Sequence, residues 1–154
     1  VGMDRAAAAP GVLEAIREAD VILLPPSNPV VSIGIILGVP GVRDALRGSP
    51  APVVGVSPLI AGAPVRGHAD ACLTAIGLES TAQAVAGLYA DFLDGWLIDD
   101  ADAPALGFAP RLEVQTRPLW MRDVQSAADI AGEAVNLAVK LRRHRPGANP
   151  LAGE

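Results

Sequence analysis

Short apolar runs, separated by polar segments rich in proline and glycine, recur along the chain. Four segments are predicted to be strands, at 21–24, 53–56, 96–98 and 112–116. The runs at 21–24 and 53–56 contain no polar position, which is typical of a strand buried on both faces of a parallel sheet. Pro25 and Pro26 end the first run, because proline has no N–H to donate to a neighbouring strand.

Apolar residues follow helical spacing between these strands. Helices are predicted over 11–19, from 32 onward, over 42–47 and 68–76, from 80 to about 93, and over 123–143. Ser32 is expected to be the N-cap of the second helix, and Ser80 with Gln83 matches a capping box. Gly77 is expected to close the helix that precedes it, and Pro40-Gly41 predicts a break.

Strands that alternate with helices predict the α/β class, with an open, mostly parallel sheet covered by helices on both faces. A length of 154 residues suits one domain, which we assign to residues 1–144. Residues 145–154 lack any period and are predicted to be a disordered tail. Because position 1 is not methionine, we expect the chain to be a fragment of a longer one.

The loops that follow the first three predicted strands are the natural place for a ligand. They span 25–32, 57–62 and 99–102. An open parallel sheet binds ligands outside the carboxyl ends of its strands, where such loops gather. The three loops are also the segments least easily explained as plain connectors.

The first of these loops predicts an anion site. Ser27 and Asn28 supply side-chain donors, and Ser32 with the amides of Ile33 and Gly34 would form a cradle at a helix N-terminus. Glycine at 34 permits close approach of the backbone to a phosphate. The alternative is a proline-shaped turn in which these polar side chains satisfy only their own backbone.

The second loop supplies the adjoining wall. Ser57, Pro58 and Gly62 lie at the matching strand end, and Arg66 is a candidate partner for a phosphate. The segment 58–67, with two prolines and two glycines, is expected to form no regular structure. The alternative is a flexible crossover that carries one surface arginine.

Acidic residues cluster near the third loop. They are Asp91, Asp94, Asp99, Asp100 and Asp102. Such carboxylates are suited to Mg²⁺, which prefers oxygen ligands, although solvated carboxylates at helix ends are the alternative that we favour. His68 and His144 are interpreted as surface residues. The chain contains neither a GxGxxG fingerprint nor a Walker loop.

Composition narrows the classes of function. A formal net charge of −5 argues against a protein that coats nucleic acid, but permits a small anionic ligand. Cys72, the single cysteine, cannot form an intrachain disulfide; this fits a reducing cytoplasm, and we interpret the residue as a buried small hydrophobe. No segment reaches the roughly 18 uninterrupted apolar residues of a membrane span, and the first residues do not resemble a signal peptide.

Three segments together resemble one enzyme family. They are PPSNPVVSIGIILGVPGVRDAL, APVVGVSPLIAG and LYADFLDGWLIDDADA. The motifs PSNP-x-x-SIG-x-IL, V-x-SP-x-x-G and DG-x-x-ID occur in order within them. This pattern resembles the 2-phospho-L-lactate transferase family of coenzyme F420 biosynthesis, over about residues 10–120.

The resemblance implies a Rossmann-like sheet and a cytoplasmic transferase. The implied reaction moves a phosphoryl-linked C3 acid from a guanosine diphosphate conjugate to the deazaflavin FO, with Mg²⁺ assisting and GMP leaving. The alanine-rich, acidic composition resembles the actinobacterial branch, whose donor is thought to carry enolpyruvate. The resemblance also allows a homodimer. The alternatives are a non-catalytic regulator of the same superfamily that binds a nucleotide sugar, an inactive fragment, and a stand-alone anion-binding module unrelated to either.

The resemblance also assigns roles and marks absences. It places Ser27, Asn28, Ser32, Ile33 and Gly34 at the phosphate or C3-acid end of the donor, and Ser57, Pro58 and Gly62 along the adjoining wall. The family's N-terminal glycine-rich loop has no counterpart before Pro10, so the chain resembles the C-terminal part of a larger domain. General base and metal ligands are therefore expected elsewhere, and Arg117 receives no role because TRPLWM departs from the family pattern.

Overall fold

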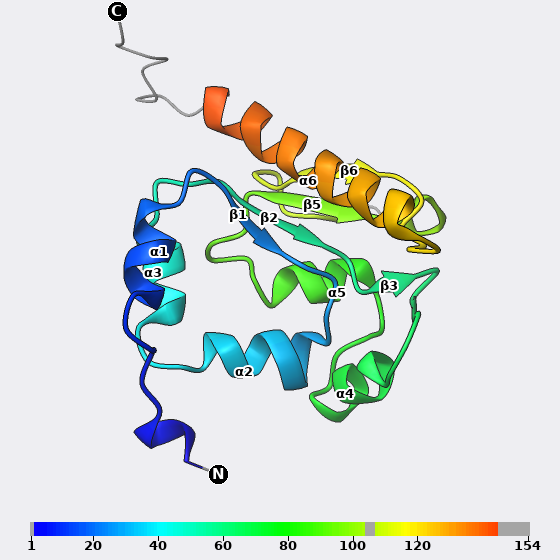
Figure 1. Cartoon of the computed structure of the whole chain (residues 1–154). Helices are drawn as coiled ribbons and strands as arrows, with labels where there is room; N and C mark the ends of the chain where they lie inside the picture. The colour runs from blue at the N-terminus through cyan, green and yellow to red at the C-terminus, as the bar shows by residue number, and fades with distance from the viewer. Residues whose placement is uncertain (1, 104–106, 145–154) are drawn as a thin grey trace, which may run out of the picture.

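A parallel sheet of four strands forms the centre of the described part of the molecule (Figure 1). The computed structural model describes residues 2–103 and 107–144. The strands are β1 (Ile22–Leu24), β2 (Val53–Val56), β5 (Gly95–Ile98) and β6 (Glu113–Thr116), in the spatial order β1-β2-β5-β6. Every neighbouring pair runs parallel. All four predicted strands are confirmed, each to within one residue.

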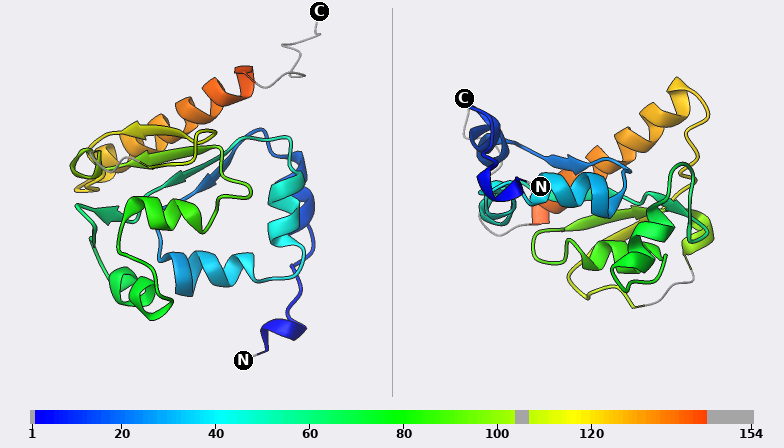
Figure 2. Two further views of the ribbon diagram at one scale, coloured as in Figure 1. Left: turned by 180° about the vertical axis from the view of Figure 1, so that it is seen from behind. Right: turned by 90° about the horizontal axis from the view of Figure 1, so that it is seen from below.

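Helices cover both faces of this sheet (Figures 1 and 2). On one face α6 (Val124–His144) packs on Val54, Val56 and Leu97 through an apolar stripe. That stripe contains Ile130, Ala134, Leu137 and Ala138, all buried. The opposite face packs on the helices α2 (Gly34–Leu37), α3 (Val42–Gly48), α4 (Ala69–Ala75) and α5 (Ala82–Gly87). This arrangement is the predicted Rossmann-like α/β class.

The strands lack alternation because both of their faces are buried. Val53 and Val54 are consecutive in β2 and point to opposite faces, and they are 1% and 0% exposed. Gly55 pairs with Trp96 of β5. A Cβ atom at position 55 would lie 2.4 Å from the Trp96 ring, so only glycine leaves room for that ring.

The first helix and α3, α4 and α6 all match their predicted ends to within one residue. The first helix, α1, spans Val12–Glu18, and α4 ends in a left-handed Gly77 with φ of 78°. The amides of Gly77 and Leu78 donate to the carbonyls of Thr74 and Leu73. These are the two closing bonds that a C-terminal glycine makes possible.

The predicted N-caps are wrong at both serines. Asn28 caps the second helix, which begins as a π-helical turn, η2 (Pro29–Ile33), and continues into α2, so Ser32 lies inside the helix. Pro29 occupies the first helical position, where proline's missing N–H costs nothing, and this moves the start four residues earlier. Thr81 caps α5, while Ser80 donates its hydroxyl to the carbonyl of Gly62.

The helix predicted to run to about residue 93 is shorter than expected. It ends at Gly87, and residues 88–92 follow as turns. The amides of Leu88, Tyr89 and Phe92 each donate to the carbonyl three residues earlier, which tightens the backbone into separate turns. The helical apolar pattern persists because Tyr89, Phe92 and Leu93 are buried all the same.

The segment 58–67 contains regular structure, contrary to expectation. Leu59–Ile60 (β3) pairs antiparallel with Ala63–Pro64 (β4) as a small hairpin. Its two turn residues, Ala61 and Gly62, have φ of 51° and 72°. Two left-handed residues form the turn that matches the twist of a hairpin, and a proline is tolerated in an edge strand.

Two short helical turns complete the described elements, η1 (Met3–Arg5) and η3 (Asp100–Asp102). The predicted tail at 145–154 lies outside the described residues. Among the described residues no single helix is long and apolar enough to cross a membrane. The pair Pro29–Leu37 and Val42–Gly48, bent by 79°, passes that test by length and composition alone. Both segments contribute buried residues to the core.

Candidate functional site

A cavity of about 460 Å³ opens at the carboxyl ends of the strands. Segments that follow β1, β2 and β6 line it, together with the start of α4. Its polar lining comes from Ser27, Asn28, Ser57, Arg66 and His68. Its apolar lining comes from Pro26, Pro58, Ile60, Val65, Gly67, Ala69, Leu119 and Met121. The first two predicted loops therefore meet at one site, as the geometry of a parallel sheet requires.

The residues predicted from the sequence divide into two groups. Ser27, Asn28, Ser57 and Pro58 line the cavity together. The others, which are Ser32, Ile33, Gly34 and Gly62, are not among its lining residues. The cavity thus collects the side-chain donors of the two loops, whereas the helix-end backbone and the hairpin turn lie outside it.

Asn28 organises the beginning of the second helix. Its Oδ1 accepts hydrogen bonds from the amides of Val30 and Val31, at 2.9 and 3.1 Å. Its backbone carbonyl accepts from the amides of Ser32 and Ile33. Asparagine is well suited to this role because its short side chain reaches the first free N–H groups of a helix.

The backbone amides that were expected to bind a phosphate therefore make hydrogen bonds inside the helix. The amide of Ile33 donates to the Asn28 carbonyl, and that of Gly34 donates to the Pro29 carbonyl. Ile33 is only 6% exposed because its side chain packs in the core. A Cβ atom at Gly34 would lie 2.9 Å from the Pro29 carbonyl oxygen, so glycine here permits the π-helical turn. In this structure these amides are not free for a phosphate.

Ser57 and Gly62 shape the second loop. The Ser57 amide donates to the Leu97 carbonyl at 2.8 Å and so extends the pairing of β2 with β5. The Ser57 hydroxyl, 3% exposed as a residue, accepts from the Leu59 amide at 3.2 Å. Gly62 donates its amide to Asp102 at 2.9 Å. Both residues hold the hairpin against the strand ends.

The charge of the cavity is positive. Arg66 is exposed and, among the described residues, its guanidinium makes no hydrogen bond or ion pair. None of the described residues that line the cavity is acidic. His68, interpreted as a surface residue, is exposed but lies at the wall of the cavity beside Arg66 in the chain. Among the described residues this arginine has no partner and the cavity lining has no carboxylate, and this combination favours an anionic ligand.

Sequence reasoning missed Leu119 and Met121 of the cavity wall. They follow β6, so the rule that strand ends gather at one edge already contained the signal for them. The amide of Leu119 donates to Asp99 at 2.8 Å, and this bond ties the segment after β6 to the end of β5.

Several carboxylates of the acidic cluster accept hydrogen bonds that stabilise the fold, so they are not simply solvated. Asp94 accepts from the Val53 amide, and Asp102 accepts from the amides of Ala61 and Gly62. Asp91 binds Arg43 at 2.6 Å, and the hydrogen bond from Arg43 lowers the pKa of Asp91 to about 2. In the described residues no group of three or more histidine, cysteine or acidic side chains is placed to hold a metal ion. Among the described residues these carboxylates therefore form no shared metal position, and we assign them no cation.

Cys72 differs from its interpretation as a buried small hydrophobe. It is only half-buried, on α4, and its Sγ accepts a hydrogen bond from Asn28 Nδ2 at 3.4 Å. Sulfur is a weak acceptor, and Asn28 lies 44 residues away in the sequence. The apolar context of Cys72 in the sequence therefore did not indicate this polar contact.

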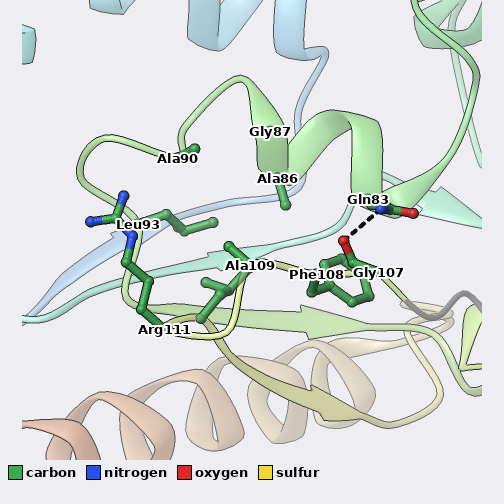
Figure 3. A pocket seen from close by; sticks show the side chains of 10 residues that line it. Gln83, Ala86, Gly87, Ala90, Leu93, Gly107, Phe108, Ala109 and Arg111 are labelled. Atoms are coloured by element: carbon green, nitrogen blue, oxygen red, sulfur yellow. Dashed lines mark hydrogen bonds between the residues drawn. The ribbon is translucent and has the colours of Figure 1, made fainter.

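A second cavity, of about 180 Å³, lies between α5 and the segment before β6 (Figure 3). Small apolar residues dominate its lining, and Gln83 Nε2 closes one end by donating to the Gly107 carbonyl at 2.6 Å (Figure 3). Arg111 stands at the other end in this view. The cavity shares no lining residue with the strand-end site.

Comparison with known proteins agrees with the motifs. The family model described as 2-phospho-L-lactate transferase CofD matches residues 1–136. Similar curated proteins, each named phosphoenolpyruvate transferase, include those of Thermobifida fusca (strain YX), 59% identical over 143 residues, Kitasatospora aureofaciens, 57% over 145, and Mycolicibacterium smegmatis, 49% over 143.

These alignments cover 90 to 92% of this chain but 43 to 45% of the relatives. The chain therefore spans less than half the length of the curated relatives it matches. The family model covers most of the chain, including every segment that lines the strand-end cavity. The chain belongs to the 2-phospho-L-lactate transferase CofD family.

Proposed function

We propose that the chain forms the donor-binding part of a transferase in coenzyme F420 biosynthesis. The donor would be a guanosine diphosphate conjugate of a C3 acid, and the acceptor the deazaflavin FO. The relatives are named phosphoenolpyruvate transferase, which favours enolpyruvate over lactate as that acid. The observation that carries the proposal is the cavity at the strand ends, whose described residues include an arginine without an ion-pair partner and no carboxylate.

In the proposed reaction a hydroxyl oxygen of FO forms a bond to the phosphorus that carries the C3 acid. The bond between that phosphorus and the bridging oxygen of GMP breaks, GMP leaves with the electron pair, and the hydroxyl loses its proton. Phosphoryl transfer depends mainly on positioning and on neutralising charge. Asn28 and Arg66 would supply both, as donors to the phosphate oxygens.

Ser27 would add a further donor, while Ser57 and Pro58 would form the adjoining wall. Ser32, Ile33, Gly34 and Gly62 would act by supporting these lining residues, since their backbone groups hold η2 and the hairpin. Mg²⁺ would neutralise phosphate charge in the complete enzyme. We assign it no ligand among the described residues.

A chimera tests the proposal directly. This chain would replace the matching 143 residues of the Thermobifida fusca protein. The match covers 43% of that protein, so more than half of the chimera comes from the relative. We expect the chimera to convert FO to its phosphoenolpyruvyl derivative in the presence of the guanosine diphosphate donor, and to release one GMP per turnover. The unmodified relative is the positive control, and mass spectrometry of the product is the measurement. A folded chimera without product or GMP would contradict the proposal.

A further inference from the structure

The side-chain amide of Asn28 has little hydrogen-bonding capacity left for a ligand. A primary amide offers one oxygen with two acceptor positions and one NH₂ with two hydrogens. The amides of Val30 and Val31 occupy Oδ1, and Cys72 takes one Nδ2 hydrogen. Among the described residues the second N–H of the NH₂ group has no acceptor, and this side chain lines the cavity. Asn28 can therefore only donate to a ligand.

The orientation of this amide is held from both ends. If the side-chain amide were rotated by 180°, its NH₂ group would face the N–H groups of Val30 and Val31. Donors would then face donors, and no hydrogen bond could form. The opposite end rests on Cys72, from a different element, because α4 packs against η2. The same helix also brings His68 and Ala69 to the cavity wall.

We propose that Cys72 is a positioning residue of the strand-end site. By accepting from Nδ2, it holds Asn28 so that its second N–H faces the cavity and meets an anionic oxygen of the ligand. The inference rests on the proposed function for the identity of the ligand, but the hydrogen bonds of Asn28 are formed by the protein alone. Cys72 itself is not among the residues that line the cavity.

The decisive comparison is between Cys72→Ser and Cys72→Val. Both side chains are close to cysteine in size, but only serine keeps an acceptor. With inorganic pyrophosphate as the probe and calorimetry of the whole chain, we expect Cys72→Val to weaken binding by about three- to tenfold, which corresponds to one neutral hydrogen bond. Cys72→Ser should stay within about twofold of the wild type. Equal losses in both variants would overturn the proposal.

A second variant tests the donor role of Asn28. Asn28→Asp keeps the oxygen that caps η2, since aspartate and asparagine are equally good N-caps, but it replaces the whole NH₂ group, including the hydrogen donated to Cys72, by a charged acceptor. We expect an unchanged melting temperature and at least about tenfold weaker pyrophosphate binding. Unchanged binding in this folded variant would show that Asn28 does not donate to the anion, and would overturn the inference.

A measurement without ligand separates this inference from the proposed function. The rate at which the Asn28 Nδ2 hydrogens exchange with water can be followed by NMR, with the resonance assigned through Asn28→Asp. We expect faster exchange in Cys72→Val than in the wild type or in Cys72→Ser. Equal rates in all three would refute the role of Cys72, even if the wild type binds pyrophosphate. Absence of pyrophosphate binding together with the expected rates would refute the anion site alone.

Discussion

Trp96 shows how a single residue constrains its surroundings in this sheet. It is 1% exposed, its ring covers Gly55 of the neighbouring strand, and its Nε1 donates to the Ala82 carbonyl at 3.1 Å. Tyr89 meets the same ring edge-on at a centroid distance of 6.3 Å. Burial raises the pKa of the Tyr89 hydroxyl. The tryptophan therefore joins β2, β5 and α5 at one point.

Gly55→Ala is expected to destabilise the protein by about 1–3 kcal/mol, because the added methyl group overpacks the Trp96 ring. The free energy of unfolding in urea is the measurement. Gly132→Ala is the matched control, since no atom of the described residues outside its own helix lies within 4 Å of a Cβ at that position in α6. That variant should gain about 0.5–1 kcal/mol. Equal effects at the two positions would contradict the packing argument.

Asp91 predicts a dependence of stability on pH. Its pKa is lowered from 3.8 to about 2, first by the hydrogen bond from Arg43 and less by that from Arg47. A lowered pKa contributes stability that is fully present above the unfolded value, near pH 4, and is lost as the pH falls through about 2. Asp91→Asn should therefore be less stable than the wild type at pH 7, by about 1 kcal/mol.

The difference between Asp91→Asn and the wild type should shrink as the pH falls from 4 to 2. Thermal unfolding at pH 7, 4 and 2.5 measures it. Asp70→Asn is the control for the loss of one exposed carboxylate, because Asp70 makes no ion pair among the described residues. A gap for Asp91→Asn that stays constant over this range would contradict the role of the two arginines.

At the scale of elements, carboxylates at strand ends connect segments that are distant in sequence. Asp99 follows β5, is 8% exposed, and binds the Leu119 amide through Oδ2 and the Ala101 amide through Oδ1. Asp102 does the same for the turn of the β3–β4 hairpin. These bonds hold the segments after β2, β5 and β6 together around the cavity.

Asp99→Ala is expected to cost about 1–3 kcal/mol, because it leaves the buried Leu119 amide without its acceptor. Asp99→Asn, which retains one oxygen, should cost less. Equilibrium unfolding in urea is the measurement, and Asp100→Ala is the control, because this neighbour is exposed and should change stability by no more than about 0.5 kcal/mol. A neutral Asp99→Ala would show that the bond carries no stability.

Element prediction from sequence succeeded where the signal is local. The runs at 21–24 and 53–56 and the closing Gly77 need no partner to be recognised. It failed where the deciding contact is distant or in competition. Ser80 was expected to cap a helix, but its hydroxyl is taken by the carbonyl of Gly62, eighteen residues away. A capping pattern cannot reveal such a competitor.

At the scale of the molecule, the site exists because the order of the strands brings three strand-end segments together. Arg66 and Arg111 are both exposed and, among the described residues, neither guanidinium has an ion-pair partner. Only Arg66 lines the strand-end cavity, whereas Arg111 stands at the second one. The two therefore form a matched pair for a test of location.

Arg66→Ala is expected to weaken the binding of pyrophosphate about tenfold, the effect of one charge-assisted hydrogen bond. It should also flatten the dependence of affinity on salt, because one cation no longer takes part. Arg111→Ala should leave both unchanged. Calorimetry at two salt concentrations is the measurement. Similar losses in the two variants would mean that the anion is attracted by general surface charge and not bound at the strand ends.

The sequence by itself determined the four strands, the α/β class and the two loops that meet at the strand-end cavity. These follow from unbroken apolar runs, from prolines that end strands, and from the rule that parallel strands share one carboxyl edge. Only the tertiary structure decided which polar groups remain available there. The backbone amides of Ile33 and Gly34 make hydrogen bonds within the helix. The side chain of Asn28 donates to Cys72, and Arg66 has no ion-pair partner among the described residues. The reason is physical: a polar group's availability depends on competing partners, and those come from distant parts of the chain.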